Sequence, residues 1–338
     1  MLKKMRFFRF LKIITGIQVH ISKHIGLSIV ITELVTLIKI IYLNDIIERR
    51  FLMNAFADFH VHSTRSDGAF DIQTLINMAR AAHIRYLAIT DHNKLVPNIE
   101  VYQDENPDIV LITGSEISST FYWNNGKSTE IHIVGLFMDH TKQLEDILKK
   151  NQTSNEDWIK KIITNLNNLG LEIGSYDDIQ KCFPGRQVRR MLLAEAMVQK
   201  KLVPSIDVAL DFYIGDRGKR LAWEEPCKIR YIPFKKAINT IHDANGIAVL
   251  AHPLSYVLSE QEREDLIRTF KQYGGDCLEV FYAAYSEEER KKVKLLADSF
   301  GLSYSCGSDF HGFSATDTLE NNFPSEIYYQ LLRKKRML

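Results

Sequence analysis

The sequence is poor in cysteine, and its positive and negative charges nearly cancel. Only four cysteines occur among 338 residues (Cys182, Cys227, Cys277 and Cys306), and no two form a C-x-x-C pair. This usage is typical of reduced thiols in a cytosolic protein and excludes a disulfide framework or a Cys-rich zinc site. A formal net charge of +1 provides no global attraction to nucleic acid. Internal repeats, low-complexity tracts and a Ser-His-Asp or Cys-His arrangement are also missing.

Residues 1–52 differ in composition from the rest of the chain. The first twelve residues are basic and aromatic, and Ile25 to Leu43 is apolar apart from Glu33 and Lys39. No small-x-small site follows a compact apolar core, which disfavours a cleavable signal peptide. Three interpretations remain: an amphipathic helix on a membrane or on the protein, a poor transmembrane segment, or an extension upstream of a start at Met53. We expect a peripheral helical extension with at most weak membrane contact.

From residue 56 onward, short β-rich runs alternate with helical ones. This alternation is typical of βα units around a parallel sheet. Helical periodicity covers residues 71–82, 232–244, 260–273 and 287–300. The predicted strands are residues 56–62, 86–90, 109–113, 131–137, 247–251, 277–281 and 302–305. Seven strands with mostly helical connections predict a closed or nearly closed barrel.

A long segment without strand signals interrupts this series between the fourth and fifth strands. Helical patterns cover residues 158–169, 176–182, 187–200 and 206–213. We therefore predict a helical cap at residues 155–228, inserted in a barrel formed by residues 53–154 and 229–338.

The histidines and carboxylates of the barrel gather at predicted strand ends. His60 and His62 alternate along the first strand and therefore point to one face, as two ligands of a divalent metal would. Further candidates follow or end the other strands: Asp67, Asp91, His92, Glu116, His132, His252, Glu279, Asp309 and His311. Because barrel active sites form where the strands end, we predict that these side chains converge on a multinuclear metal site.

This ordered set of motifs resembles the PHP (polymerase and histidinol phosphatase) superfamily. The resemblance spans about residues 56–312 and rests on His60-Val61-His62, Asp67-Gly68, Thr90-Asp91-His92, Glu116, His132, Ala251-His252-Pro253 and Ser308-Asp309-Phe310-His311. It implies a distorted (β/α)7 TIM-like barrel that binds two or three divalent ions (Mn, Fe or Zn) and hydrolyses phosphoesters.

The resemblance also implies a ligand set for each ion. His60, His62, Glu116 and Asp309 would hold one metal, with Glu116 bridging to its neighbours. Asp67, His92 and His311 would hold a second, and His132 and His252, with Glu116, a third. Asp91 is interpreted as a supporting group that orients His92.

Part of the cap resembles the PHP members that act on nucleoside 3′,5′-bisphosphates and short RNA 5′ ends. Gly185 to Arg189 carries this resemblance, with Val188 where those proteins typically have histidine. Arg186 and Arg189 are the predicted substrate-binding residues, because a guanidinium can pair with two phosphate oxygens. Of the two, Arg186 is the stronger candidate.

We therefore hypothesise a phosphoesterase for a small phosphorylated substrate, with no stable protein partner implied. A metal-bridging hydroxide would attack phosphorus in line. The predicted catalytic residues are Asp67, His92, Glu116, His252 and Asp309. One alternative is a histidinol-phosphate-type phosphatase, which usually has histidine where this chain has Asp67. Another is a non-catalytic metal-binding regulatory module, although degenerate scaffolds generally lose ligands.

Overall fold

The protein is described by a computed structural model, which covers residues 56–215, 219–223, 231–313, 317–319 and 323–336. The predicted N-terminal helix and a start at Met53 lie outside these residues. Within the described part, no helix combines the length and apolarity needed to cross a bilayer.

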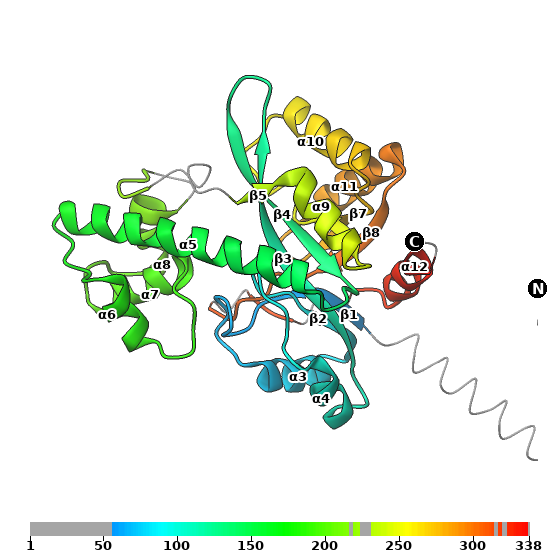
Figure 1. Ribbon diagram of the computed structural model, residues 1–338, viewed down its shortest axis with the longest axis horizontal. Coiled ribbons are helices and arrows are strands. Elements are labelled where there is room, and N and C mark those ends of the chain that lie inside the picture. Colours follow the sequence, from blue (N-terminus) through cyan, green and yellow to red (C-terminus); the bar gives the residue numbers. More distant parts are fainter. Residues whose placement is uncertain (1–55, 216–218, 224–230, 314–316, 320–322, 337–338) are drawn as a thin grey trace, which may run out of the picture. The chain divides into compact units, whose positions relative to one another are not determined.

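The other elements pack around an eight-stranded sheet, in which seven strands follow one another and a short eighth strand pairs with one of them (Figure 1). In sheet order the seven are β1 (Phe56–Val61), β2 (Ile84–Ile89), β3 (Val110–Tyr122), β4 (Ser128–Leu136), β6 (Ile247–Leu250), β7 (Cys277–Tyr282) and β8 (Ser303–Gly307). The chain after β8 returns to β1, where the Asp309 N–H donates to the His60 carbonyl at 2.7 Å. The His62 N–H likewise donates to the Phe310 carbonyl at 3.0 Å. These contacts nearly close the sheet into the predicted barrel.

The expectation of a parallel sheet is wrong at β4. This strand pairs antiparallel with both β3 and β6, whereas β1, β2 and β3, and likewise β6, β7 and β8, pair parallel. β3 also extends to Tyr122, nine residues beyond the predicted end at Thr113, and forms a hairpin with β4. No helix connects these two strands because the hairpin turn at residues 123–127 already reverses the chain.

Helices with clear start signals cover the barrel strands. Ser259 and Ser286 each form a capping box with a glutamate three residues later, at the starts of α10 and α11. The barrel helices are α3 (Ile72–Ala81), α4 (Ile99–Glu105), α9 (Phe234–Asp243), α10 (Glu260–Gln272), α11 (Glu287–Phe300) and α12 (Glu326–Lys335). The helix predicted from residue 232 begins at Phe234, because Ile232–Pro233 forms the short strand β5 beside β3.

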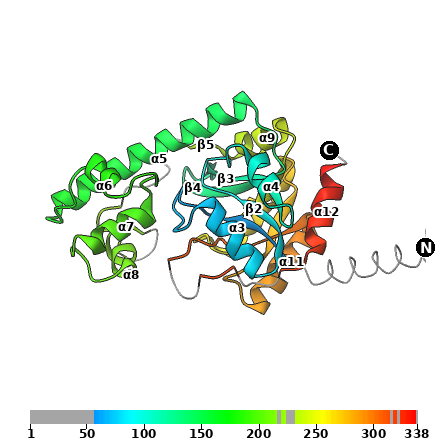
Figure 2. The same cartoon turned by 90° about the horizontal axis from the view of Figure 1, so that it is seen from below.

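The described part of the segment between β4 and β5 contains helices, as predicted. It comprises α5 (Lys142–Asn168), α6 (Tyr176–Cys182), α7 (Arg190–Gln199), α8 (Ile206–Val208) and the π-helix η1 (Ala209–Ile214). These helices share an apolar core of their own, formed by residues between Trp158 and Ala222. Figure 2 shows them gathered beside the barrel, with α5 reaching from one group of elements to the other.

Helix α5 runs straight through the predicted cap boundary at residues 154–155. Its first turns pack Leu144 and Leu148 into the barrel core, whereas Trp158 and the apolar residues after it belong to the core of the cap. Asn151, fully buried between the two, donates to Asn93 Oδ1 at 2.9 Å and to the Ser118 carbonyl at 2.7 Å. A buried amide bonded to the loop after β2 and to the interior of β3 fixes the helix to the barrel.

Candidate metal centre

His60 of β1 and His62, the residue that directly follows this strand, point into the mouth of the barrel. Phe59 and Val61 pack against apolar groups on the other face, and His60 and His62 are fully buried. His60 Nε2 lies 3.3 Å from Glu116 Oε1, and His62 Nε2 lies 3.4 Å from Glu116 Oε2. The period-two alternation of the strand therefore brings both imidazoles to the same carboxylate.

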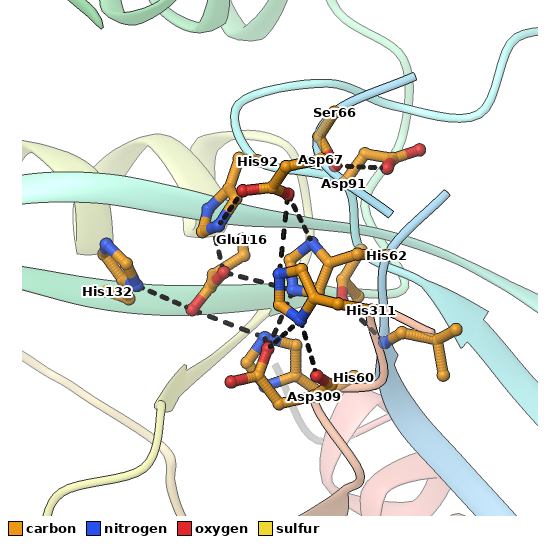
Figure 3. Close-up of polar contacts among 12 residues, drawn as sticks. His60, His62, Ser66, Asp67, Asp91, His92, Glu116, His132, Asp309 and His311 are labelled. Atoms are coloured by element: carbon orange, nitrogen blue, oxygen red, sulfur yellow. Dashed lines mark hydrogen bonds and ion pairs between the residues drawn. The ribbon is translucent and has the colours of Figure 1, made fainter. Parts of the chain in front are cut away.

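Glu116 occupies the centre of the site. This fully buried side chain also lies 2.9 Å from His92 Nδ1, 2.8 Å from His132 Nδ1 and 3.0 Å from His252 Nε2. Figure 3 shows the imidazoles arranged around the carboxylate, which projects from the middle of β3. The sequence placed Glu116 at a strand end, but β3 continues past it because Ser118, Ser119 and Thr120 are buried rather than in a loop.

The potential ligand atoms converge in three overlapping groups, each within 4.8 Å. The groups are His60, His62, Glu116 and Asp309; His62, Asp67, His92 and His311; and His92, Glu116 and His132. The first is the set expected for one metal, and the second is the expected second set with His62 added. The third contains His92 where His252 was expected. All nine sequence-predicted ligands are brought together, since His252 contacts Glu116 directly.

The contacts among these side chains leave part of their hydrogen-bonding capacity unused. Several of their nitrogen and oxygen atoms are buried and lack a hydrogen-bond partner: His60 Nε2, His62 Nδ1 and Nε2, Asp67 Oδ1, His92 Nδ1, Glu116 Oε2 and His252 Nδ1. Burying so many unpaired polar atoms is costly unless something else occupies the space between them. Mixed imidazole and carboxylate donors that face a common point fit divalent metal ions.

The charges of these groups compensate one another. Burial raises the pKa of the Glu116 carboxyl, but His132, His92 and His60 outweigh this effect and hold the pKa well below its usual value. Burial disfavours the charged form of His132, yet Glu116 and Glu130 raise its pKa to about 10. A carboxylate cluster this deep needs positive charge beside it, which either protons on imidazoles or metal ions can provide.

Glu279, a strand-end candidate to which the sequence gave no ligand assignment, holds two of the histidines in place. Glu279 Oε1 lies 2.9 Å from His60 Nδ1, and its Oε2 accepts the His252 backbone N–H at 2.7 Å. This arrangement leaves His60 Nε2 directed at the metal centre, as a supporting carboxylate does at many metal sites. A detectable signal existed, because a glutamate in the middle of the apolar strand Cys277–Tyr282 is unusual.

Asp91 supports a different neighbour from the one expected. Its carboxylate accepts the Ser63 N–H at 2.8 Å, the Ser63 hydroxyl at 2.6 Å and the Ser66 hydroxyl. Asp91 thereby orders the loop that carries Asp67, rather than orienting His92. Gly68 completes this loop, because a Cβ there would lie 2.1 Å from the His62 carbonyl oxygen.

Strained backbone surrounds the centre. Asn93, His252 and Asp309 all adopt positive φ angles, of 53°, 29° and 56°. Such conformations cost non-glycine residues energy, and they cluster at functional sites where surrounding structure enforces them. Gly307 shows how close the packing is, since a Cβ there would lie 2.2 Å from His60 Cβ.

A cavity of about 920 Å³ opens from the metal centre toward the cap. Arg189, Arg190 and Arg220 line it, and Arg189 Nε lies 3.2 Å from Asp67 Oδ2. Of the two predicted substrate-binding arginines, Arg189 lines the cavity. Arg186 is not part of the lining; it pairs with Glu195 at 2.9 Å and stacks on Phe183 and Phe313.

The structure shows where Val188 lies, the residue that stands in place of the histidine typical of the proteins that the cap resembles. The Val188 side chain is fully buried in the core of the cap, and it is not among the residues that line the cavity. A valine there contributes to packing, so the polar lining comes from the neighbouring arginines instead.

Comparison with known proteins agrees with this geometry. The PHP domain model matches residues 58–163. A 5′-3′ exoribonuclease of Haemophilus influenzae is 34% identical over 257 residues, which are 75% of this chain and 89% of the relative. A 3′,5′-nucleoside bisphosphate phosphatase of Chromobacterium violaceum is 29% identical over 262 residues, 75% of this chain and 86% of that protein.

A solved structure shares the fold as well. It is an amidohydrolase from Chromobacterium violaceum with bound sulfate and no metal, 26% identical, with a TM-score of 0.70 over 83% of this chain and 97% of that one. The chain belongs to the PHP family of metal-dependent phosphoesterases, and it is a hydrolase of phosphoester bonds. The histidinol-phosphate alternative receives no specific support from these matches.

Proposed function

We propose that the protein hydrolyses phosphate esters at the 3′ position of 5′-phosphorylated nucleotides, either nucleoside 3′,5′-bisphosphates or short RNA strands. The observation that carries this proposal is the position of Arg189. Its guanidinium lies beside the Asp67 end of the metal centre, where the cap closes over the barrel. A substrate with two phosphates could place one at the metals and the other among the cap arginines. The named activities of the two relatives support the same substrate class.

The metal ions would be held by the three overlapping groups of ligands. Nitrogen and carboxylate donors without thiolate suit Mn²⁺, Fe²⁺ or Zn²⁺, and three groups allow two or three ions. When bound, such ions lower the pKa of water and neutralise charge on phosphoryl oxygens. His60, His62, Glu116 and Asp309 would hold the first ion. His62, Asp67, His92 and His311 would hold the second, and His92 or His252 with Glu116 and His132 the third.

The cap residues would position the substrate rather than take part in the chemistry. Arg189 is almost fully buried, and its Nη1 has no hydrogen-bond partner within the protein. Arg190 and Arg220 are held over the ring of Trp223, with Cζ 5.4 Å and 5.3 Å from its centroid. Guanidinium groups held over a ring can still donate N–H bonds to a phosphate. We infer that this arginine cluster binds the 5′-phosphate.

The barrel residues would keep the reacting groups fixed and dry. Glu279 holds His60 in one orientation, and Asp91 fixes the loop with Asp67. The metal-ligand side chains are buried or half-buried under the cap, which excludes bulk water and strengthens every electrostatic interaction at the scissile phosphate.

A phosphate-release screen tests the proposal. Purified protein with added Mn²⁺ would be given adenosine 3′,5′-bisphosphate, histidinol phosphate and a short 5′-phosphorylated RNA. We expect turnover of the bisphosphate, of the RNA or of both, and none of histidinol phosphate. Turnover of histidinol phosphate alone would overturn the substrate assignment.

Elemental analysis tests the metal sites separately. We expect more than one Mn, Fe or Zn per chain after anaerobic purification. Protein that is folded but holds no transition metal, even after incubation with Mn²⁺, would contradict the ligand assignment.

A further inference from the structure

All three tryptophans of the chain line the cavity that opens from the metal centre. Trp158 comes from α5, Trp223 from the described segment after η1, and Trp123 from the turn between β3 and β4. A cavity of about 920 Å³ lies near the upper end of the usual range for small-ligand sites, roughly 300–1,000 Å³. There is space for more than a single small phosphate ester.

The two cap tryptophans and the hairpin tryptophan have different surroundings. The guanidinium of Arg190 lies over both cap rings, 5.6 Å from the Trp158 centroid and 5.4 Å from that of Trp223. Arg220 lies over Trp223 as well. Trp123 instead meets Phe121 at an angle of 60°, with the ring centroids 4.6 Å apart. The cap rings therefore carry cations, whereas Trp123 forms an aromatic part of the wall.

Trp123 is held rigidly although its side chain is only half-buried. Its indole Nε1–H donates to Thr129 Oγ1 at 2.8 Å, and its backbone N–H donates to the Lys127 carbonyl at 2.9 Å. Both bonds cross the turn of the hairpin. A ring fixed in this way loses little conformational entropy when a ligand stacks on it.

The loop before α10 lines the same cavity and is tied to the metal centre. The hydroxyl of Tyr256 accepts the backbone N–H of His132 at 2.9 Å. The next residue, Val257, is an apolar side chain that is 74% exposed and lines the cavity with Trp123. The exposed valine, the fixed indole and the exposed Lys127 all line this cavity. Apolar surface and an ammonium group in one cavity suit a flat apolar group attached to an anion.

We propose that Trp123 and Val257 form a subsite for the base of the nucleoside that follows the scissile phosphate in a short RNA strand. This inference rests on the proposed function. With the 5′-phosphate at the cap arginines and the scissile phosphate at the metals, the next nucleoside continues toward the hairpin. Water adds to phosphorus and the P–O3′ bond breaks. The proton ends on the 3′ oxygen of the released nucleotide, and the phosphate stays on the 5′ oxygen of the following nucleoside.

The test compares two substrates that share the scissile P–O3′ bond. Adenosine 3′,5′-bisphosphate carries no second nucleoside, whereas the 5′-phosphorylated adenosine dinucleotide does. We expect Trp123→Ala to lower the ratio of kcat/KM for the dinucleotide to kcat/KM for the bisphosphate by about 5- to 150-fold, the usual cost of removing one base-stacking aromatic. Trp123→Phe should restore most of the ratio, and Trp123→Leu should not.

Tyr122→Ala is the matched control. Tyr122 is the adjacent aromatic on the same hairpin, is 60% exposed and is not part of the cavity lining. Its removal should leave the ratio within about twofold of the wild-type value, as surface substitutions usually do. An equal effect of Tyr122→Ala and Trp123→Ala, or an unchanged ratio in Trp123→Ala and Trp123→Leu, would overturn the subsite.

A binding measurement separates this inference from the proposed function. Fluorescence anisotropy of a 3′-labelled, phosphorothioate-linked form of the dinucleotide, with Mn²⁺ present, needs no turnover. If neither substrate is hydrolysed, the proposed function fails, and about 5- to 150-fold weaker binding to Trp123→Ala still supports the subsite. Equal affinity for the wild type and for both the alanine and leucine variants would refute it. Thermal unfolding of each variant confirms that the hairpin change leaves the fold intact.

Discussion

The barrel mouth and the cap enclose the same cavity, yet they hold their polar side chains in different ways. In the barrel, Glu116 and the imidazoles around it are fixed by backbone geometry and by buried partners such as Glu279. In the cap, Arg190 and Arg220 rest on tryptophan rings more than 5 Å away. Short directional contacts fix the metal-facing donors of the barrel closely, and cation–π attraction adds to what holds these two arginines in the cap. Under the proposed function, the chemistry would belong to the barrel and recognition of the 5′-phosphate to the cap.

The largest expected effect comes from the centre of the barrel. Glu116→Gln keeps the shape of the side chain but removes the charge shared by two of the three ligand groups. We expect activity to fall by far more than the roughly 10- to 100-fold loss typical of supporting residues around a metal. Elemental analysis should show reduced metal content. Full metal content and normal phosphate release in this variant would contradict the assignment of Glu116 as a shared metal ligand.

The next largest loss of activity is expected from a cap arginine, and Arg186 provides a matched control for Arg189. Arg189→Ala should lower kcat/KM by about 10- to 150-fold, as expected for losing a hydrogen bond to a charged phosphate. Arg186→Ala removes the same side chain from a position outside the cavity and should change kcat/KM by no more than about threefold. Metal content should stay normal in both. Equal losses for the two variants would contradict the assignment of recognition to Arg189.

A supporting carboxylate of the barrel gives an effect of similar or smaller size. Glu279→Gln retains a group that can contact His60 but removes the charge, and we expect about 10- to 100-fold weaker metal binding. Titration of metal-free protein with Mn²⁺ measures this directly. Because the cap is untouched, KM measured at saturating metal should remain close to the wild-type value. A raised KM with unchanged metal affinity would contradict the assignment of Glu279 to metal binding alone.

The smallest effect is expected from a carboxylate at the opposite end of the barrel. Asp276 precedes β7 and accepts bonds from His242 at 2.8 Å and from the Ala248 N–H at 2.9 Å. Burial raises the pKa of Asp276, but these bonds and Lys334 outweigh it and lower the pKa below the ordinary value. Asp276→Asn should cost about 1 kcal/mol of stability at neutral pH, with unaltered metal content and activity.

The pH dependence of this cost has a definite sign. Because the folded pKa of Asp276 is lower than the unfolded one, its contribution is complete above about pH 4 and disappears as the pH falls through the folded pKa. Denaturant unfolding of both proteins from pH 7 to pH 2 should show their stabilities converging in acid. A constant difference over that range would mean that the charge of Asp276 contributes nothing.

The ligands of the barrel could be predicted from the sequence because their order along the chain is set by the strands. Each motif ends or follows an apolar run, so the alternation of side chains already places His60 and His62 together. The direction of β4 could not be predicted in the same way, because an apolar run looks alike in a parallel or an antiparallel strand. The length of β3 was hidden too, since Ser118, Ser119 and Thr120 resemble a loop in sequence but are buried in the structure.

The contacts of the polar residues in the cap were harder to predict, because they depend on how the cap helices pack. Arg186 and Arg189 lie three residues apart, and no sequence pattern shows that one meets Glu195 and the other Asp67. The predicted start of the cap at residue 155 falls inside one continuous helix, in which Asn151 and Asn155 are both buried. Glu279 was noticed in its strand, but only the short distance to His60 gives it a function.

Helix α5 fixes the orientation of the cap arginines relative to the metal centre in the barrel. Its 27 residues form a continuous rod about 40 Å long, with Asn151 fixed to the barrel and Trp158 embedded in the cap. Adding one residue between these points would turn everything beyond it by about 100° and advance it by about 1.5 Å. Both halves could still fold, but the arginines would face away from the metals. The number of residues between Asn151 and Trp158 thus determines whether the cap arginines and the metal ligands can face the same substrate molecule.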